Sequence, residues 1–321
     1  MVVVELLALV ISVIVLARSS SVVVDNAVKL SLFFGISQIT IGFMLVAVST
    51  SLPELSVSVV SSTIGEGAIA AGNVFGSNIA NILLILGLGA FLYGIKINTS
   101  ELRDISLVLL LTTLISVYII FSSSVAVRAL GFFEGVLLLG CFGAYAWYHL
   151  TSKRPEENNG TEVTKKEAMK AFLFFSMAIL VVIVSSGFVV EYAVRLASLM
   201  GIAESFIGAT IIAVGTSLPE LSIDLQAIRK KRYGLALGDA VGSNMVNITL
   251  VLGVAAVINP IQVIIPVFIA ALLFAVIANT VLLYVAAVNK GIGRFGGAAF
   301  LLIYAIYIVV IFFLQLREMQ G

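Results

Sequence analysis

Residues 47–54 read AVSTSLPE and residues 213–220 read AVGTSLPE, so one eight-residue phrase occurs twice in the chain. A second phrase follows each copy: GNVFGSNIAN at 72–81 and GDAVGSNMVN at 238–247. The members of each pair lie 166 residues apart. The same offset relates three further pairs of similar residues: Asp25 and Glu191, Lys29 and Arg195, and Gly42 and Gly208. Agreement at so many positions indicates an internal duplication.

The composition places the chain in a membrane. Hydrophobic residues make up 61% of the 321 residues and charged residues only 11%, whereas soluble domains are about 25% charged. The formal net charge of +1 gives no reason to expect a nucleic acid or other polyanion as a partner. Residues 1–17 are apolar but lack a basic start and a small-residue cleavage pattern, so we expect a first membrane span there and no signal peptide.

Hydrophobic runs long enough to cross a bilayer, about 20 residues each, predict ten spans. They cover residues 1–17, 37–62, 69–93, 105–122, 130–150, 168–190, 204–228, 235–258, 263–287 and 296–316. Segments 20–36 and 187–203 are interpreted as amphipathic lead-ins to the second and seventh spans. We therefore expect an all-α polytopic membrane protein whose partner is the lipid bilayer. The sequence gives no sign of an enzyme or of an obligate protein partner.

The polar stretch 151–167 divides the ten spans into two sets of five. This predicts a first repeat at residues 1–150, a short linker at 151–167 and a second repeat at 168–321. An odd number of spans in each repeat places the two repeats in opposite orientations. Secondary transporters with this inverted plan bind their substrates near the midplane, where helices are broken.

The distribution of basic residues predicts the orientation through the positive-inside rule. With an external N-terminus, fifteen of the 18 lysines and arginines lie on the cytoplasmic side, and only Arg128, Arg195 and Arg317 lie outside. We expect a cell-membrane protein with both termini extracytoplasmic. Glu220 precedes Arg229 by nine residues, about 13 Å at 1.5 Å per residue, which puts this glutamate near the middle of the bilayer.

The TSLPE phrase combines a helix breaker with an ionisable residue. Pro53 and Pro219 remove backbone hydrogen bonds and free carbonyl groups in the preceding turn. In hydrocarbon such carbonyls need a ligand or a cavity. Glu54 and Glu220 follow within the same apolar runs, and an ionisable residue inside a membrane span is a candidate functional site.

The oxygens available near each proline favour a hard cation. Thr50 and Glu54, like Thr216 and Glu220, are four residues apart and share a helix face. Carbonyl, hydroxyl and carboxylate oxygens together suit Na⁺ and Ca²⁺, the latter taking six to eight oxygen ligands.

The second phrase adds neutral ligands to this set. Ser77 and Asn81 share a helix face, as do Ser243 and Asn247. Asn78 and Asn244 are equally well explained as polar residues that join membrane helices. Soft ligands are missing from both phrases, because Cys141 and His149 lie elsewhere, which argues against zinc and copper. His149, beside Trp147 and Tyr148, is interpreted as a residue of an interfacial aromatic belt.

Both phrases resemble the α-repeats of the Ca²⁺/cation antiporter superfamily, in particular the prokaryotic members of its sodium/calcium exchanger branch. The resemblance extends over nearly the whole chain. It implies a compact bundle in which the second, third, seventh and eighth spans enclose several cation sites. It also implies exchange of Na⁺ for Ca²⁺ by alternating access, with the first and sixth spans sliding against the core. No cofactor is implied, since Ca²⁺ and Na⁺ are the transported ions.

The resemblance carries ligand roles to matching positions of this chain. The carboxylates match Glu54 and Glu220. The other matching positions are the hydroxyls of Thr50, Ser51, Thr216, Ser217, Ser77 and Ser243, the amides of Asn81 and Asn247, and the backbone carbonyls of Ala47 and Ala213.

Four positions depart from the family pattern. Ser49 replaces a usual glycine, and Asn247 replaces the aspartate of potassium-dependent members, which weakens the case for K⁺ dependence. Asp239 stands where Asn73 and most members have asparagine. Asp224, one turn from Glu220, corresponds to Ser58. Asp224 fits a vestibule or an ion pair with the basic run at 229–232, while the role of Asp239 stays open.

Three other functions compete with Na⁺/Ca²⁺ exchange. A Ca²⁺/H⁺ antiporter is the close alternative, because two apposed buried carboxylates can bind protons. An intramembrane aspartyl protease is disfavoured, since Ala236 replaces the first glycine of a GxGD signature around Asp239. A passive channel fits poorly with inverted repeats and broken helices.

Overall fold

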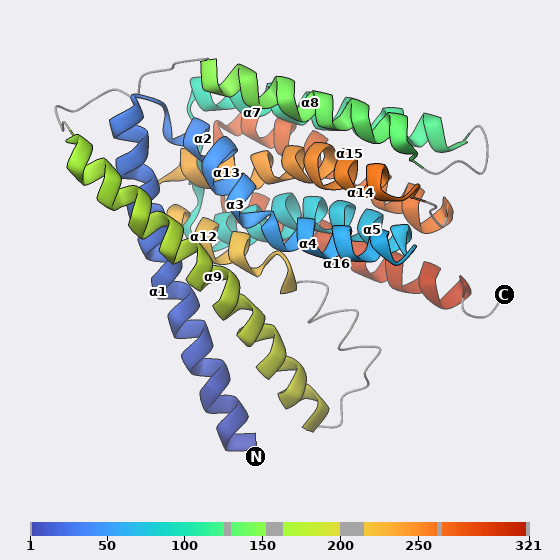
Figure 1. The fold of residues 1–321 in the computed structure, drawn as a ribbon, viewed down its shortest axis with the longest axis horizontal. Helices are drawn as coiled ribbons and strands as arrows, with labels where there is room; N and C mark the ends of the chain where they lie inside the picture. The colour runs from blue at the N-terminus through green and yellow to red at the C-terminus, as the bar shows by residue number, and fades with distance from the viewer. Residues whose placement is uncertain (1, 125–129, 152–162, 200–214, 262–264, 319–321) are drawn as a thin grey trace.

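The computed structural model describes residues 2–124, 130–151, 163–199, 215–261 and 265–318, and almost all of them are helical (Figure 1). The first half contains α1 (Val2–Phe34), α2 (Gln38–Ile41), η1 (Gly42–Val46), α3 (Ala47–Thr50), α4 (Leu52–Thr63), α5 (Gly67–Ile79), η2 (Ala80–Leu86), α6 (Gly87–Tyr93), β1 (Ile95–Lys96), α7 (Thr99–Ser124) and α8 (Phe132–Thr151). The second half contains α9 (Lys165–Leu199), α12 (Leu218–Arg229), α13 (Tyr233–Val246), η4 (Asn247–Val251), α14 (Leu252–Ile258), α15 (Ile265–Asn289), β2 (Gly291–Ile292) and α16 (Arg294–Glu318). The segments named η are π-helical turns inside longer helices.

Seven helices in the described part of the chain are long and apolar enough to cross a membrane. The bent pair Gln38–Thr50 and Leu52–Thr63, with a 43° break between its parts, raises the number to eight. The expected span at 130–150 forms α8, which is not among these eight. Residues 204–214 of the expected span at 204–228, and residues 152–162 of the expected linker, fall outside the described residues. The chain is thus a helical multi-pass membrane protein, and its count of ten spans stays a prediction.

The helices α1 and α9 lie side by side and slant across the other helices (Figure 1). The expected division of α1 into a span and a lead-in at 20–36 is wrong, because the helix runs unbroken to Phe34. No proline or glycine interrupts residues 18–34. The helix ends in a Schellman motif: Gly35 adopts a φ of +63°, and the Ile36 amide donates to the Ser31 carbonyl at 3.1 Å. Likewise α9 continues through most of the expected lead-in at 187–203, to Leu199.

Short strand pairings join the two halves at both ends of α7. Before α7, Ile95 and Lys96 of β1 pair antiparallel with Ile292 and Gly291 of β2. After α7, Leu130 forms an isolated antiparallel bridge with Ile261. A helix of 26 residues is about 39 Å long, so these two pairings lie a membrane thickness apart.

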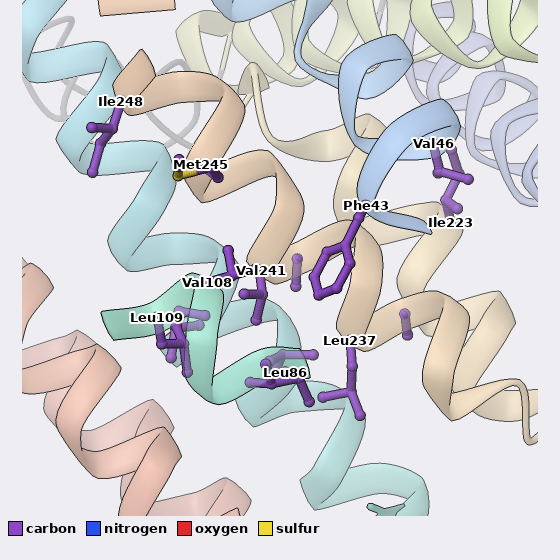
Figure 2. Packing of buried hydrophobic residues seen from close by; sticks show 14 of the residues in the cluster. Phe43, Val46, Leu86, Val108, Leu109, Ile223, Leu237, Val241, Met245 and Ile248 are labelled. Carbon is purple, nitrogen blue, oxygen red and sulfur yellow. The ribbon is translucent and has the colours of Figure 1, made fainter. Parts of the chain in front are cut away.

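The helix α13 forms the centre of the bundle, and every one of its residues from Gly234 to Val246 is buried. Its glycines at 234, 238 and 242 are spaced four residues apart and lie against α2 and η1. A Cβ built on Gly238 would lie 2.4 Å from the Ile39 carbonyl oxygen, and one on Gly242 would lie 2.8 Å from the Phe43 Cα. Figure 2 shows Phe43 beside Leu237 and Val241 in this packed core. Small residues of this kind let membrane helices approach closely.

The interpretation of His149 as an interfacial residue is wrong, because its side chain is only 7% exposed. Its ring centroid lies 4.9 Å from that of Phe43 and 4.6 Å from that of Tyr145. The Tyr145 hydroxyl also donates to the Phe43 carbonyl at 3.2 Å. The π-helical segment η1 begins at Gly42, so α8 packs against the turn that precedes the first TSLPE phrase.

Candidate functional site

In each TSLPE phrase, a helix begins just after the serine that lies two residues before the proline. Ser51 separates α3 from α4 with φ −76° and ψ 4°, and Ser217 precedes α12 with φ −88° and ψ 9°. Each proline lies in the first turn of the new helix, where its missing N–H costs no hydrogen bond. The prolines therefore start a helix and do not kink a continuous one. The glutamate that follows is placed in the same first turn.

The two glutamates are buried at the centre of the bundle. Glu54 is 0% exposed and Glu220 is 1% exposed. The Ser77 hydroxyl donates to Glu54 Oε1 at 3.2 Å, and the Ser217 hydroxyl donates to Ser77 Oγ at 3.2 Å. Thr216 lies beside Glu54 and repeats the arrangement of Thr50 beside Glu220. Glu54 thus lies beside hydroxyl groups from both halves of the chain, and Glu220 lies beside a hydroxyl group of the first half.

A second hydroxyl network connects Thr50 to α13. The Thr50 hydroxyl lies 3.1 Å from Asp239 Oδ1 and 3.3 Å from Ser243 Oγ, and Ser243 donates to the same carboxylate oxygen at 3.2 Å. Asp239 also lies close enough to Glu54 and Glu220 to repel them electrostatically. Asp239, whose role the sequence left open, therefore belongs to the same polar cluster as the two glutamates.

Four asparagines form a symmetric set of hydrogen bonds between the halves. Asn78 Nδ2 donates to the Asn244 carbonyl at 3.2 Å, and Asn244 Nδ2 donates to the Asn78 carbonyl at 3.0 Å. Asn81 donates to Asn244 Oδ1, and Asn247 donates to Asn78 Oδ1, both at 3.1 Å. These bonds use the side-chain nitrogens of Asn81 and Asn247, so their side-chain oxygens remain free to bind a cation.

The two second-phrase asparagines also start π-helical turns. Asn81 is the second residue of η2, and Asn247 is the first residue of η4. A π-helical turn inside an α-helix is uncommon and frequently marks a functional site. The same backbone irregularity thus occurs at equivalent positions of the two halves.

Several buried oxygens of these residues have no hydrogen-bond partner among the described residues. In the expected ligand set they are Ser51 Oγ, Glu54 Oε2, Asn81 Oδ1, Glu220 Oε1, Glu220 Oε2 and Asn247 Oδ1. A buried polar atom left without a partner is costly. Six such oxygens in one polar cluster are a donor set of the kind that Ca²⁺ and Na⁺ accept.

The remaining expected ligands are placed less favourably or are not described. The Ala47 carbonyl accepts both the Ser51 amide at 3.1 Å and the Thr50 hydroxyl at 3.3 Å. Ala213 lies outside the described residues. No group of three or more His, Cys, Asp and Glu side chains within the described ranges forms a metal-ligand cluster, so neutral oxygens would have to complete any cation shell.

The sequence missed two features of the site. Asn78 and Asn244 are explained equally well as cation ligands and as polar residues that join helices. Their separation of 166 residues, which places them at equivalent positions, is the signal for a pairing between them. The hydrogen bond from Tyr145 to the Phe43 carbonyl connects α8 to the turn before the first phrase, from 102 residues away. Nothing in the local sequence of α8 indicates that contact.

Comparisons with known proteins agree with this arrangement. A family described as "Sodium/calcium exchanger protein" matches residues 4–151 and 170–313. The sodium/calcium exchanger MaX1 of Methanosarcina acetivorans is 28% identical over 98% of this chain and 100% of its own length. The inner membrane protein YrbG of Escherichia coli is 35% identical over 71% of each chain.

A solved structure has the same fold. The sodium-calcium exchanger NCX_Mj, soaked with Na⁺ and no Ca²⁺, matches with a TM-score of 0.80 and 28% identity over 96% of this chain and 99% of its own. The family match covers most of both halves, including all four repeated phrases. The chain belongs to the sodium/calcium exchanger family, whose members are membrane transporters and not enzymes in the catalytic sense.

Proposed function

We propose that this protein is a secondary antiporter that exchanges Na⁺ for Ca²⁺ across a cell membrane. The observation that carries the proposal is the pair of buried glutamates, one from each half, with unpartnered oxygens beside neutral hydroxyl and amide groups. The relatives MaX1 and NCX_Mj are named as sodium/calcium exchangers, which supports the same assignment. Na⁺ and Ca²⁺ are the transported ions, and the lipid bilayer is the partner of the outer helix surfaces.

The charges of the glutamates account for competition between the two ions. Glu54 and Glu220 together carry two negative charges when ionised. One Ca²⁺ neutralises both, and so do two Na⁺. Burying unbalanced charge in a membrane is expensive, so Ca²⁺ and a full load of Na⁺ exclude each other from the site.

The proposed ligands fall into three chemical groups. Glu54 and Glu220 supply the charge. Hydroxyl, amide and backbone oxygens complete the shells without adding charge, and they belong to Thr50, Ser51, Ser77, Asn81, Ala47, Thr216, Ser217, Ser243, Asn247 and Ala213.

Alternating access would use the inverted repeats at 1–150 and 168–321, each with five spans. The strand pairings at opposite ends of α7 support this plan, since each joins a loop of one half to a loop of the other. The helices α1 and α9 carry no proposed ligand and lie as a pair against the bundle, so we assign them the role of the moving gate. Structures in two access states would contradict this if α1 and α9 stayed fixed while α4 and α12 moved.

The orientation follows from the charge distribution, with both termini extracytoplasmic and the linker 151–167 cytoplasmic. An Asn159→Cys variant in a Cys141→Ala background should resist an impermeant thiol reagent added to intact cells. It should react once the membrane is permeabilised. Labelling of intact cells would refute the proposed orientation.

The central experiment is Ca²⁺ uptake into proteoliposomes with Na⁺, K⁺ and pH gradients imposed separately. An outward Na⁺ gradient should drive uptake, and a pH gradient alone should not. Uptake driven by the pH gradient alone would favour the Ca²⁺/H⁺ alternative. Glu54→Gln and Glu220→Gln should each lower Na⁺-driven uptake by at least about a hundredfold, because removal of one partner leaves a buried charge uncompensated. Near-normal uptake by either variant would remove that glutamate from the ligand set.

A further inference from the structure

The second half holds a pair of buried acids that the first half lacks. Asp224 on α12 and Asp239 on α13 are both 0% exposed, and their carboxyl groups are in direct contact. The equivalent residues of the first half are Ser58 and Asn73, 166 positions earlier. There, Asn73 Nδ2 donates to Ser58 Oγ at 3.2 Å. The same contact is therefore neutral in one half and acidic in the other.

The acid pair has no counterion among the described residues. The basic run at 229–232 lies on the same helix as Asp224 or just beyond it, yet Asp224 forms no ion pair with it. Lys230 instead contacts Asp25 on α1, with its Nζ 2.7 Å from Asp25 Oδ1. The interpretation of Asp224 as a structural partner of this run is therefore not supported.

Among the described residues, one carboxyl oxygen of the acid pair accepts hydrogen bonds, and the other three do not. Asp239 Oδ1 accepts the hydroxyls of Thr50 and Ser243. Asp239 Oδ2 and both carboxyl oxygens of Asp224 have no hydrogen-bond partner in the part of the chain that is described. Both carboxyl oxygens of Glu220, one helical turn from Asp224, are equally unpartnered. Buried acids in contact require a positive charge or a proton between them.

We propose that Asp224 and Asp239 form an additional Na⁺ subsite, one turn from Glu220 toward the Arg229 end of α12. This inference rests on the proposed Na⁺/Ca²⁺ exchange and deepens it. Na⁺ fits better than Ca²⁺ because the subsite offers few free oxygens. The flanking helices α12 and α13 are regular, so their backbone carbonyls are engaged, whereas Ca²⁺ takes six to eight ligands.

A Na⁺ ion at this subsite would act on the main site through charge. Asp224 and Asp239 both interact electrostatically with Glu220. A positive charge between the two aspartates weakens the hold of Glu220 on Ca²⁺ and leaves it suited to Na⁺. The subsite thus helps Na⁺ to displace Ca²⁺, and it allows the protein to hold one more Na⁺ than two glutamates can balance.

The test uses the full-length purified protein and the Na⁺ concentration that displaces radioactive Ca²⁺, with choline chloride keeping the ionic strength constant. The variant Asp224→Ser with Asp239→Asn copies the neutral pair that the first half accommodates. Its Ca²⁺ affinity in the absence of Na⁺ should fall only modestly, because both glutamates and their neutral ligands remain, so the Na⁺ curves are compared at the same Ca²⁺ saturation. Its half-displacing Na⁺ concentration should rise by about tenfold, and the Hill coefficient should fall by about one, since that coefficient is bounded by the number of sites.

The controls separate this inference from the proposed function. Glu66→Gln removes an exposed acid beside α5 and should leave the displacement curve unchanged. If the double variant does not fold, Asp224→Asn alone keeps the side-chain shape and should shift the curve in the same direction. A folded variant with an unaltered Na⁺ curve would overturn the subsite. The negative charge of the two aspartates would then be offset by a shared proton. Loss of Ca²⁺ binding by a folded variant would also overturn it, whereas failure of Na⁺ to displace Ca²⁺ from the unaltered protein would overturn the proposed function itself.

Discussion

The close crossing of α13 with the α2–η1 segment predicts a large effect of one methyl group. In Gly238→Ala, the new Cβ would lie 2.4 Å from the Ile39 carbonyl oxygen and 3.1 Å from the Gly42 Cα. Carbon atoms in good contact are about 3.5–4.0 Å from their neighbours, so α13 and the α2–η1 segment would have to separate by roughly 1 Å. Both obstacles are backbone atoms, which cannot move aside by a change of rotamer.

The free-energy change can be estimated from two opposing effects. Alanine favours a helix interior over glycine by about 1 kcal/mol. Overpacking a tight interface typically costs about 1–3 kcal/mol, and backbone obstacles place this site at the upper end. We therefore expect Gly238→Ala to destabilise the protein by roughly 2 kcal/mol net. The separation also stretches the contacts of Thr50 with Asp239 and Ser243, so Ca²⁺ affinity should fall as well.

The assay is thermal unfolding in detergent, followed by Ca²⁺ binding, for Gly238→Ala and a matched control. Gly140→Ala is suitable because Gly140 lies inside α8, is exposed, and a Cβ there meets no described atom within 4 Å. The control should be as stable as the unaltered protein or slightly more stable. If Gly238→Ala unfolded at the same temperature as Gly140→Ala and bound Ca²⁺ equally well, the close crossing of α13 with η1 would be wrong.

Three further effects follow from the site and its surroundings. Asn81→Ala and Asn247→Ala should each weaken Ca²⁺ binding by about tenfold, because each removes one neutral ligand and one hydrogen bond of roughly 1.4 kcal/mol. This effect is smaller than that of losing a glutamate. A loss of binding as complete as that of Glu54→Gln would contradict the ranking of the glutamates above the asparagines. Lys230→Gln removes the contact with Asp25, a partly exposed ion pair worth about 0.2–1 kcal/mol. The rate of exchange should change by up to about fivefold while the Ca²⁺ affinity stays constant. An altered affinity with an unchanged rate would show that the contact does not restrain α1. Lowering the pH equally on both sides of the membrane should slow Na⁺-driven Ca²⁺ uptake, because protonation of either glutamate removes half of the countercharge; initial rates that rise toward acidic pH would argue against carboxylate ligands.

The sequence predicted those parts of the molecule that the duplication encodes directly. The repeated phrases predicted two broken helices with a buried glutamate just after each break. The first break occurs at Ser51, and in the second half a new helix begins just after Ser217. The family and the helical membrane class were also predicted correctly. These features depend on local chemistry: a proline that cannot continue a helix, and an acid in an otherwise apolar run.

Features that depend on contacts distant in sequence were harder to predict. Polarity alone predicts a boundary near residue 18, whereas α1 continues until Gly35 supplies a left-handed residue. Asp25 is tolerated near the end of that helix because Lys230, 205 residues later, contacts it. His149 was misjudged for a similar reason, since its partner Phe43 belongs to another helix.

The differences between the halves carry information that the duplication alone does not. Where strict symmetry is kept, as in the bonds between Asn78 and Asn244, the two repeats hold each other in place. Symmetry is broken at Lys231, which occupies the position of Gly65 and adopts a φ of 59° where glycine is favoured. It is broken again at Asp224 and Asp239, deep inside the bundle. A transporter with two identical halves would bind its ions identically from either side. Under the proposed alternating access, extra acids in one half would give the two access pathways different electrostatics, and a nearly symmetric fold would then carry an asymmetric ion load.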